Sequence, residues 1–232
     1  MMSDIFSTFD PAMSYIFSSS PLIFYSLVTF SLILTHSPLW MTPTHISWLL
    51  YFPINFMLSQ TSRTFSLHLK GFPSILVALF LMLILLNLMG LLPYNFSFTS
   101  HLILTLTFGF PLWLSLILSA LLFSPKSFLA HLLPSGAPIW LNPFLIITET
   151  LSISVRFLTL SFRLAANMSA GHILLSLMGI ATTSLLFLSF TSSTFLILIQ
   201  LSYITFEIGI CLIQAYIFCL LLSLYADDHP HM

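Results

Sequence analysis

Charged side chains are nearly absent from this sequence. Of 232 residues, five are Lys or Arg and six are Asp or Glu, which together make up 5% of the chain. Soluble domains carry about 25% charged residues, so this chain cannot build a water-soluble surface. With 58% hydrophobic residues and a mean hydropathy of +1.08, it is predicted to be an integral membrane protein.

A basic cluster and a targeting segment are also missing. The net charge is −1, which argues against nucleic acid as a partner. The opening stretch, MMSDIFSTFDP, has two Asp and no Lys or Arg, so it fits neither a secretory signal nor a mitochondrial transit peptide. We therefore expect the protein to be synthesised in the compartment where it inserts.

Cysteine and nucleotide-binding patterns are scarce as well. The two cysteines, Cys211 and Cys219, would lie ~12 Å apart on a helix, too far for a disulfide. The chain has no G-x-x-x-x-G-K-[ST] phosphate loop, so we do not expect it to catalyse nucleotide chemistry, and the chain alone is not expected to be an enzyme. The histidines other than His172 lack metal-ligand spacing, and we expect no metal and no cofactor.

Long uninterrupted apolar runs, such as 74–92, predict membrane helices rather than barrel strands. Twelve of the thirteen prolines lie at or before Pro143, so short elements come first and long helices last. The expected fold is all-α, with about five membrane-embedded helices plus an interfacial segment, ending in a long, strongly tilted two-helix hairpin. Its parts form a single membrane domain: a first span in 1–36, an interfacial segment and loop in 37–72, a transmembrane hairpin in 73–125, an inner-side loop in 126–143, and the long hairpin in 144–226.

The few cations predict an orientation. Arg63 and Lys70 precede the second span, and Lys126 follows the third, so all three lie on one side. The positive-inside rule makes this the inner side of the membrane. Counting spans then places the N-terminus outside and the C-terminus inside.

Two polar stripes run along the predicted hairpin. Glu149, Arg156 and Arg163 are spaced seven apart and share one helix face, which Asn167 extends by one turn. His172 points roughly the opposite way. The second helix carries its own stripe, in which three polar residues are again seven apart: Gln200, Glu207 and Gln214. Ionisable groups at membrane depth are costly and usually mark an ion or proton route.

An antiparallel hairpin would bring the two stripes to matching depths. With its turn expected around 189–194, His172 falls level with Glu207, and Arg163 falls close to Gln214. Glu149 reaches the level of Asp228, although we expect the two terminal aspartates to be solvated.

The residue types suit proton transfer. Histidine titrates near physiological pH, so a His172/Glu207 pair could relay protons. Arginine stays protonated and cannot relay, but it can repel a second positive charge and hold a passing carboxylate ionised. A fixed arginine between two titratable sites would therefore separate two half-channels.

At RLAANMSAGH (163–172) and EIGICLIQAYIFCLLLSLY (207–225) the sequence resembles the membrane-embedded a-subunit family of F-type ATP synthases, in its mitochondrial form. HLLPSGAP, ITETLS and NLMGLLPY (87–94) are also similar to this family, and the resemblance spans roughly residues 70–226. It implies a proton-translocating stator subunit of the Fo sector, in the mitochondrial inner membrane, with the N-terminus on the intermembrane-space side and the C-terminus in the matrix. The implied partners are the c-ring, peripheral-stalk and other Fo subunits, membrane lipid and protons.

The resemblance also implies residue roles. Arg163 would be the essential arginine facing the c-ring carboxylate, with Asn167 and Gln214 as polar neighbours. His172 and Glu207 would line the half-channel open to the intermembrane space, and Glu149 would belong to the matrix half-channel. Roles for Arg156 and Gln200 are weaker. Phe157 departs from the family, in which many relatives carry proline after the residue matching Arg156.

Two other classes compete with this interpretation. A proton-coupled secondary transporter or antiporter subunit would usually show an internal repeat and broken helices, and we find no repeat. A non-transporting anchor subunit binding quinone or haem is the other. Haem would favour paired histidines at membrane depth, and only His172 qualifies.

Overall fold

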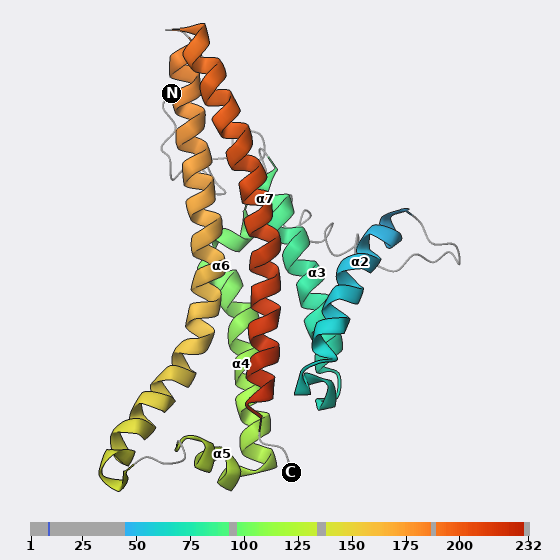
Figure 1. Cartoon of the computed structure of the whole chain (residues 1–232), viewed down its shortest axis with the longest axis vertical. Helices are drawn as coiled ribbons and strands as arrows, with labels where there is room; N and C mark the ends of the chain where they lie inside the picture. Colours follow the sequence, from blue (N-terminus) through green and yellow to red (C-terminus); the bar gives the residue numbers. More distant parts are fainter. Residues whose placement is uncertain (1–8, 10–44, 93–96, 134–137, 187–188, 230–232) are drawn as a thin grey trace, which may run out of the picture.

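The computed structural model describes residue 9 and residues 45–92, 97–133, 138–186 and 189–229 (Figure 1). Within these ranges all regular structure is helical. The elements are α2 (His45–Thr61), η3 (Phe65–His68), α3 (Phe72–Leu91), η4 (Phe98–Ser100), α4 (Leu102–Phe123), α5 (Pro125–His131), η5 (Ile139–Leu141), α6 (Asn142–Leu186) and α7 (Phe190–Asp227).

In the described part of the chain, α3, α4, α6 and α7 are long and apolar enough to cross a membrane. Together with the absence of strands there, they confirm the predicted all-α membrane fold and its terminal long hairpin. Apart from Phe9, the expected first span, in 1–36, lies outside the described residues. The segment 37–72 contains α2, which packs against α3, and the segment 126–143 contains α5 and η5.

Local sequence explains the limits of α3. Gly71 precedes it with φ of +81°, a backbone conformation that glycine adopts without strain. Pro73 occupies the first turn, where a missing N–H removes no helical hydrogen bond. Pro93 follows in sequence and disfavours further helix at Leu92.

The core forms where α7 lies between α6 and α3 (Figure 1). Phe218 and Leu222 of α7 pack into one buried cluster with Leu76 of α3 and with Leu160 and Leu164 of α6. Between helices in lipid, close packing rather than removal from water supplies the attraction. This core therefore fixes α6 and α7 side by side at the depth of their polar residues.

The hairpin turn is tighter than predicted. The polar patch Ser189–Thr194 was expected to form the turn, but α6 ends at Leu186 and α7 already begins at Phe190. The hydroxyls of Ser193 and Thr194 donate to carbonyls three residues earlier on α7, each at 2.8 Å, so helix accommodates them. With 45 and 38 residues the two helices are much longer than the ~30 Å hydrocarbon core requires.

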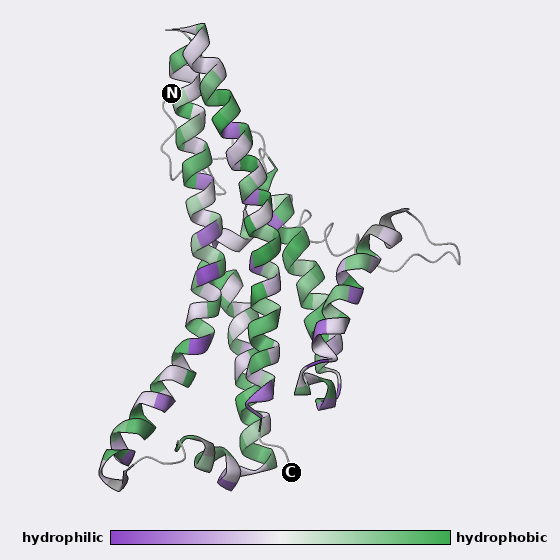
Figure 2. Ribbon diagram, in the orientation of Figure 1, coloured by the Kyte–Doolittle hydropathy of each residue, from purple (hydrophilic) through white to green (hydrophobic). Residues whose placement is uncertain are grey.

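Hydropathy along the hairpin is not uniform. Figure 2 shows hydrophilic residues interrupting the apolar surfaces of α6 and α7 at intervals, whereas α3 is almost continuously apolar. Figure 1 shows α6 alongside α7 near the turn and diverging from it toward the α6 N-terminus. Helix α4 packs against this part of α6, where Trp113 donates to the Ile153 carbonyl.

Candidate functional site

A hydrogen bond ties the two polar stripes together at mid-hairpin. Asn167 Nδ2 donates to Gln214 Oε1 at 2.8 Å. Gln214 is 5% exposed, so in a bilayer its amide depends on partners within the protein. This bond gives the hairpin a fixed register one turn away from Arg163.

Glu207 is the most deeply buried ionisable side chain of the seam, with 1% of its surface exposed. Its carboxylate lies directly against the backbone of Gly171 on α6. Tyr203, one turn earlier on α7, interacts with the same carboxylate. Glu207 Oε2 is buried and has no hydrogen-bond partner among the residues described.

His172 lies beside this carboxylate in sequence and depth, because it follows Gly171. The imidazole is half-buried, and the ring of Phe9 meets it edge-on with centroids 6.3 Å apart. His172 Nε2 is buried and, within the described ranges, lacks a hydrogen-bond partner. The structure thus brings the two groups to one level without a direct hydrogen bond between them, and each keeps a free polar atom.

Arg163 occupies the opposite, exposed side of α6. The neighbouring Leu160 and Leu164 turn inward and are buried in the core. Across the parts of the chain that the structure describes, the ion pairs all belong to Arg156, so Arg163 has no carboxylate partner there. A permanent cation is therefore presented outward from an apolar surface.

A second ionic cluster surrounds Arg156, two helical turns before Arg163. Its Nη1 donates to Asp228 Oδ2 at the end of α7, and its Nη2 lies 3.9 Å from Glu149 Oε1. The guanidinium carbon stands 5.1 Å from the ring centroid of Tyr225, a cation–π contact. One cation thus meets two carboxylates, which leaves the cluster net negative when both are ionised.

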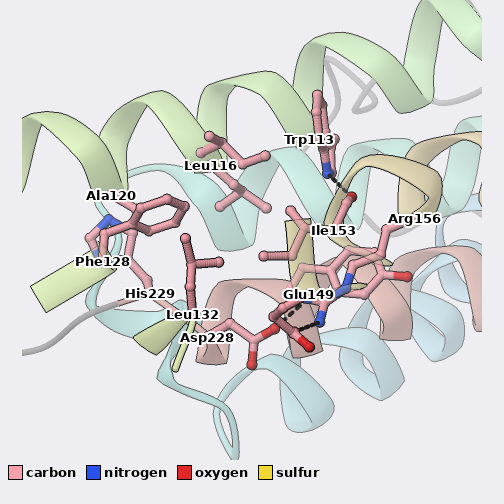
Figure 3. A pocket seen from close by; sticks show the side chains of 12 residues that line it. Trp113, Leu116, Ala120, Phe128, Leu132, Glu149, Ile153, Arg156, Asp228 and His229 are labelled. Carbon is pink, nitrogen blue, oxygen red and sulfur yellow. Dashed lines mark hydrogen bonds and ion pairs between the residues drawn. The ribbon is translucent and has the colours of Figure 1, made fainter. Parts of the chain in front are cut away.

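This cluster lines a partly open pocket with a cavity volume of about 90 Å³ between α4, α5, α6 and α7 (Figure 3). Trp113 of α4 forms one wall, and its indole Nε1 donates to the Ile153 carbonyl at 3.1 Å. Leu116 and Leu132 supply apolar walls, while Glu149 and Asp228 supply the carboxylates (Figure 3). The pocket lies at the α4–α5 end of the bundle, and a polar molecule inside it would contact the carboxylates of Glu149 and Asp228.

The structure therefore divides the candidate residues into separate groups. Glu207 and His172 lie toward the hairpin turn, Asn167 and Gln214 lie near Arg163, and Glu149 lies with Arg156. Gln200 is half-buried, and its side chain makes no hydrogen bond to any other described residue. No group of three or more His, Cys, Asp or Glu that could hold a metal occurs in the described ranges.

Sequence reasoning missed the roles of the terminal aspartates. They were expected to be solvated, yet Asp228 pairs with Arg156, and Asp227 Oδ1 accepts a hydrogen bond from the Phe65 backbone N–H at 2.8 Å. The signal was present, since Glu149 and Asp228 fall at one depth in an antiparallel hairpin. Asn87 of α3 was also missed; it is fully buried and donates to the Cys211 carbonyl at 3.4 Å.

Comparison with known proteins identifies the family of this chain. The sequence matches the ATP synthase A chain family over residues 16–227. ATP synthase subunit a of Albinaria caerulea is 48% identical over 157 residues, covering 68% of this chain and 72% of the relative. ATP synthase subunit a of Locusta migratoria is 36% identical over 230 residues (98% and 99%), and ATP synthase F(0) complex subunit a of Osphranter robustus is 35% identical over 229 residues (99% and 100%). The chain belongs to the ATP synthase A chain family.

Proposed function

We propose that the hairpin seam carries protons in two separate half-channels, and that Arg163 keeps them apart. As a member of its family, the chain is the proton-translocating subunit of the Fo sector, a multi-pass membrane protein and a component of a rotary complex with other ATP synthase subunits. The comparisons give no support to the alternative of a proton-coupled secondary transporter or antiporter subunit.

The observation that carries the proposal is the position of Arg163. It is exposed, it has no carboxylate partner among the described residues, and it lies between the Glu207/His172 level and the Arg156 cluster. An unpaired arginine at membrane depth is costly. A carboxylate supplied from outside this chain would remove that cost, and a c-ring passing this face would supply one repeatedly.

In the proposed cycle, a proton enters through His172 and Glu207 and protonates a c-ring carboxylate, which then turns away into lipid. After nearly a full turn, the same carboxylic acid releases its proton toward Glu149. The ionised carboxylate passes Arg163, whose charge stays fixed because a guanidinium does not deprotonate in proteins. Arg163 also repels a proton that would cross directly between the half-channels.

The ionic pocket suits the release side. Glu149 and Asp228 can each accept a proton, and Arg156 holds both near one another. The cation pattern supports placing this end in the matrix: Arg63 and Lys70 precede α3, Lys126 follows α4, and α7 ends at the α5 end of the molecule (Figure 1). The N-terminus would then face the intermembrane space of the mitochondrial inner membrane.

The remaining assignments follow from this scheme. The chain would not catalyse ATP chemistry, because its sequence has no phosphate loop. Its partners would be the c-ring, which brings the missing carboxylate, and peripheral-stalk and other Fo subunits, which keep the chain from rotating. A ring of small hairpin proteins with a buried carboxylate should co-purify with it, whereas solute uptake by the isolated chain in vesicles would favour a transporter.

Replacing His172 tests the proton-uptake side. His172→Ala should slow proton-driven ATP synthesis without loss of assembly, because it removes a titratable group but no hydrogen bond present in the described structure. His68→Ala, in the exposed η3 turn, is the matched control and should leave the rate unchanged. Equal rates in the two variants would remove His172 from the proton path.

A further inference from the structure

Gly171 lies in the middle of α6, directly against the Glu207 carboxylate. A Cβ atom at residue 171 would collide with Oε1 and Cδ of Glu207 and would lie 2.9 Å from Oε2. No other glycine in the described ranges has so close a neighbour. Gly179, two turns later on the same helix, has nothing within 4 Å of that position.

The backbone gives no separate reason for glycine here. In the described chain, Gly71 is the glycine with positive φ, so residue 171 has a conformation that any L-amino acid adopts. Glycine is also one of the weakest helix formers. The space occupied by the Glu207 side chain is therefore the feature of this structure that requires residue 171 to lack a Cβ.

Glu207 has little freedom to move elsewhere. It is 1% exposed, and Cys211 on the following turn is fully buried against Met168 of α6, with Sγ and Sδ 3.6 Å apart. Tyr203 interacts with the carboxylate from the preceding turn. A methyl group at residue 171 would thus push the carboxylate away from α6. Because His172 also lies on α6, the distance between the Glu207 carboxylate and His172 would increase.

We infer that Gly171 is a positioning residue whose missing side chain forms the seat of the Glu207 carboxylate. This inference rests on the proposed proton path through Glu207. It extends that path from the groups that titrate to the gap in α6 that holds one of them in place, and it makes the size of residue 171 a determinant of the proton-uptake rate.

The first test compares two glycines of α6 in the assembled ATP synthase. Gly171→Ala should lower proton-driven ATP synthesis by about tenfold or more, as expected for a reacting group displaced by ~1 Å. Gly179→Ala has the same chemistry with open space around it and should keep the wild-type rate. Equal rates in the two variants would overturn the inference.

The second test moves the carboxylate back. Aspartate is one methylene shorter, so Glu207→Asp withdraws the carboxylate by about 1.5 Å and leaves room for a methyl group. The Gly171→Ala/Glu207→Asp double variant should be several-fold faster than Gly171→Ala alone. If Gly171→Ala fails to assemble, the double variant should restore assembly. No gain in either measure would overturn the inference.

Glu207→Gln separates this inference from the proposed function. Undiminished ATP synthesis in Glu207→Gln would contradict the role of the carboxylate in the path. Impaired synthesis in Glu207→Gln, together with equal rates for the two glycine variants, would support the proton path through Glu207. The same pair of results would reject only the inference that Gly171 positions the carboxylate.

Discussion

Arg156 and Arg163 lie two turns apart on one helix and meet opposite surroundings. Arg156 contacts Asp228, Glu149 and the ring of Tyr225, so its charge is satisfied within the chain. Arg163 is exposed and has no carboxylate partner in the described residues. The two side chains are chemically identical, so the difference lies in their environments. Arg156 links α6 to the end of α7, whereas the charge of Arg163 is available to a partner.

At the same scale, the two glutamines of α7 offer a matched pair. Gln214→Ala removes the acceptor of the Asn167 amide, so we expect about 0.5–1.5 kcal/mol of destabilisation. Gln200→Ala removes no hydrogen bond to a described residue and should cost much less. Thermal dissociation of the purified complex measures both, and equal midpoints would contradict a structural role for the Asn167–Gln214 bond.

Sequence spacing predicted the relative depths of these residues but not all of their contacts. Helical rise is regular, so an antiparallel hairpin places His172 level with Glu207 and Glu149 level with Asp228 whatever the side chains do. The contact between Arg156 and Asp228 depends on helix rotation at the end of α7, where an aspartate is ordinarily solvated. The Gly171 seat has no sequence signal of its own, because it is defined by a side chain on another helix.

At the scale of elements, α4 fixes the part of α6 that diverges from α7. Trp113 donates to the Ile153 carbonyl, and its ring lies 4.8 Å from that of Phe157. Phe110 adds a second aromatic contact with Phe157 at 5.4 Å. Phe157 is therefore an aromatic side chain that joins α4 to α6.

Trp113→Phe tests that connection. The substitution keeps an aromatic ring but removes the N–H donor, so we expect a loss of about 0.5–1.5 kcal/mol in stability. Trp140→Phe is the control, because Trp140 is 91% exposed in η5. Thermal unfolding of the two variants in one detergent should show a lower midpoint for Trp113→Phe alone. A larger effect at Trp140 would contradict the assignment of Trp113 as the α4–α6 contact.

The helix pattern was more predictable than the helix ends. Continuous apolar runs and the scarcity of proline after Pro143 predicted two long helices, because nothing in that stretch disrupts the backbone hydrogen bonds. The hydroxyl-rich patch at Ser189–Thr194 was misinterpreted as a turn. Serine and threonine can satisfy their hydroxyls on their own helix, so polarity alone did not predict where α6 ends.

At the scale of the whole molecule, the described part of the chain lacks one group that the proposed cycle needs, a carboxylate facing Arg163. It supplies a buried Glu207/His172 site, a pocket around Glu149, and an arginine between them, but within the described ranges no acid meets Arg163. In the proposed cycle, a moving carboxylate on a partner would meet Arg163 and would pass between the two proposed proton sites, which lie at different depths. The same arrangement requires a permanent charge at residue 163.

The most direct test of this account is proton-driven ATP synthesis by assembled complexes that differ only at arginines. Arg163→Ala should abolish coupled synthesis, and Arg163→Lys should also fail because a lysine at membrane depth, away from water, can lose its proton. Arg63→Ala, in the exposed segment before α3, should retain synthesis. Coupled synthesis at the Arg63→Ala rate in a fully assembled Arg163→Ala complex would contradict the central claim.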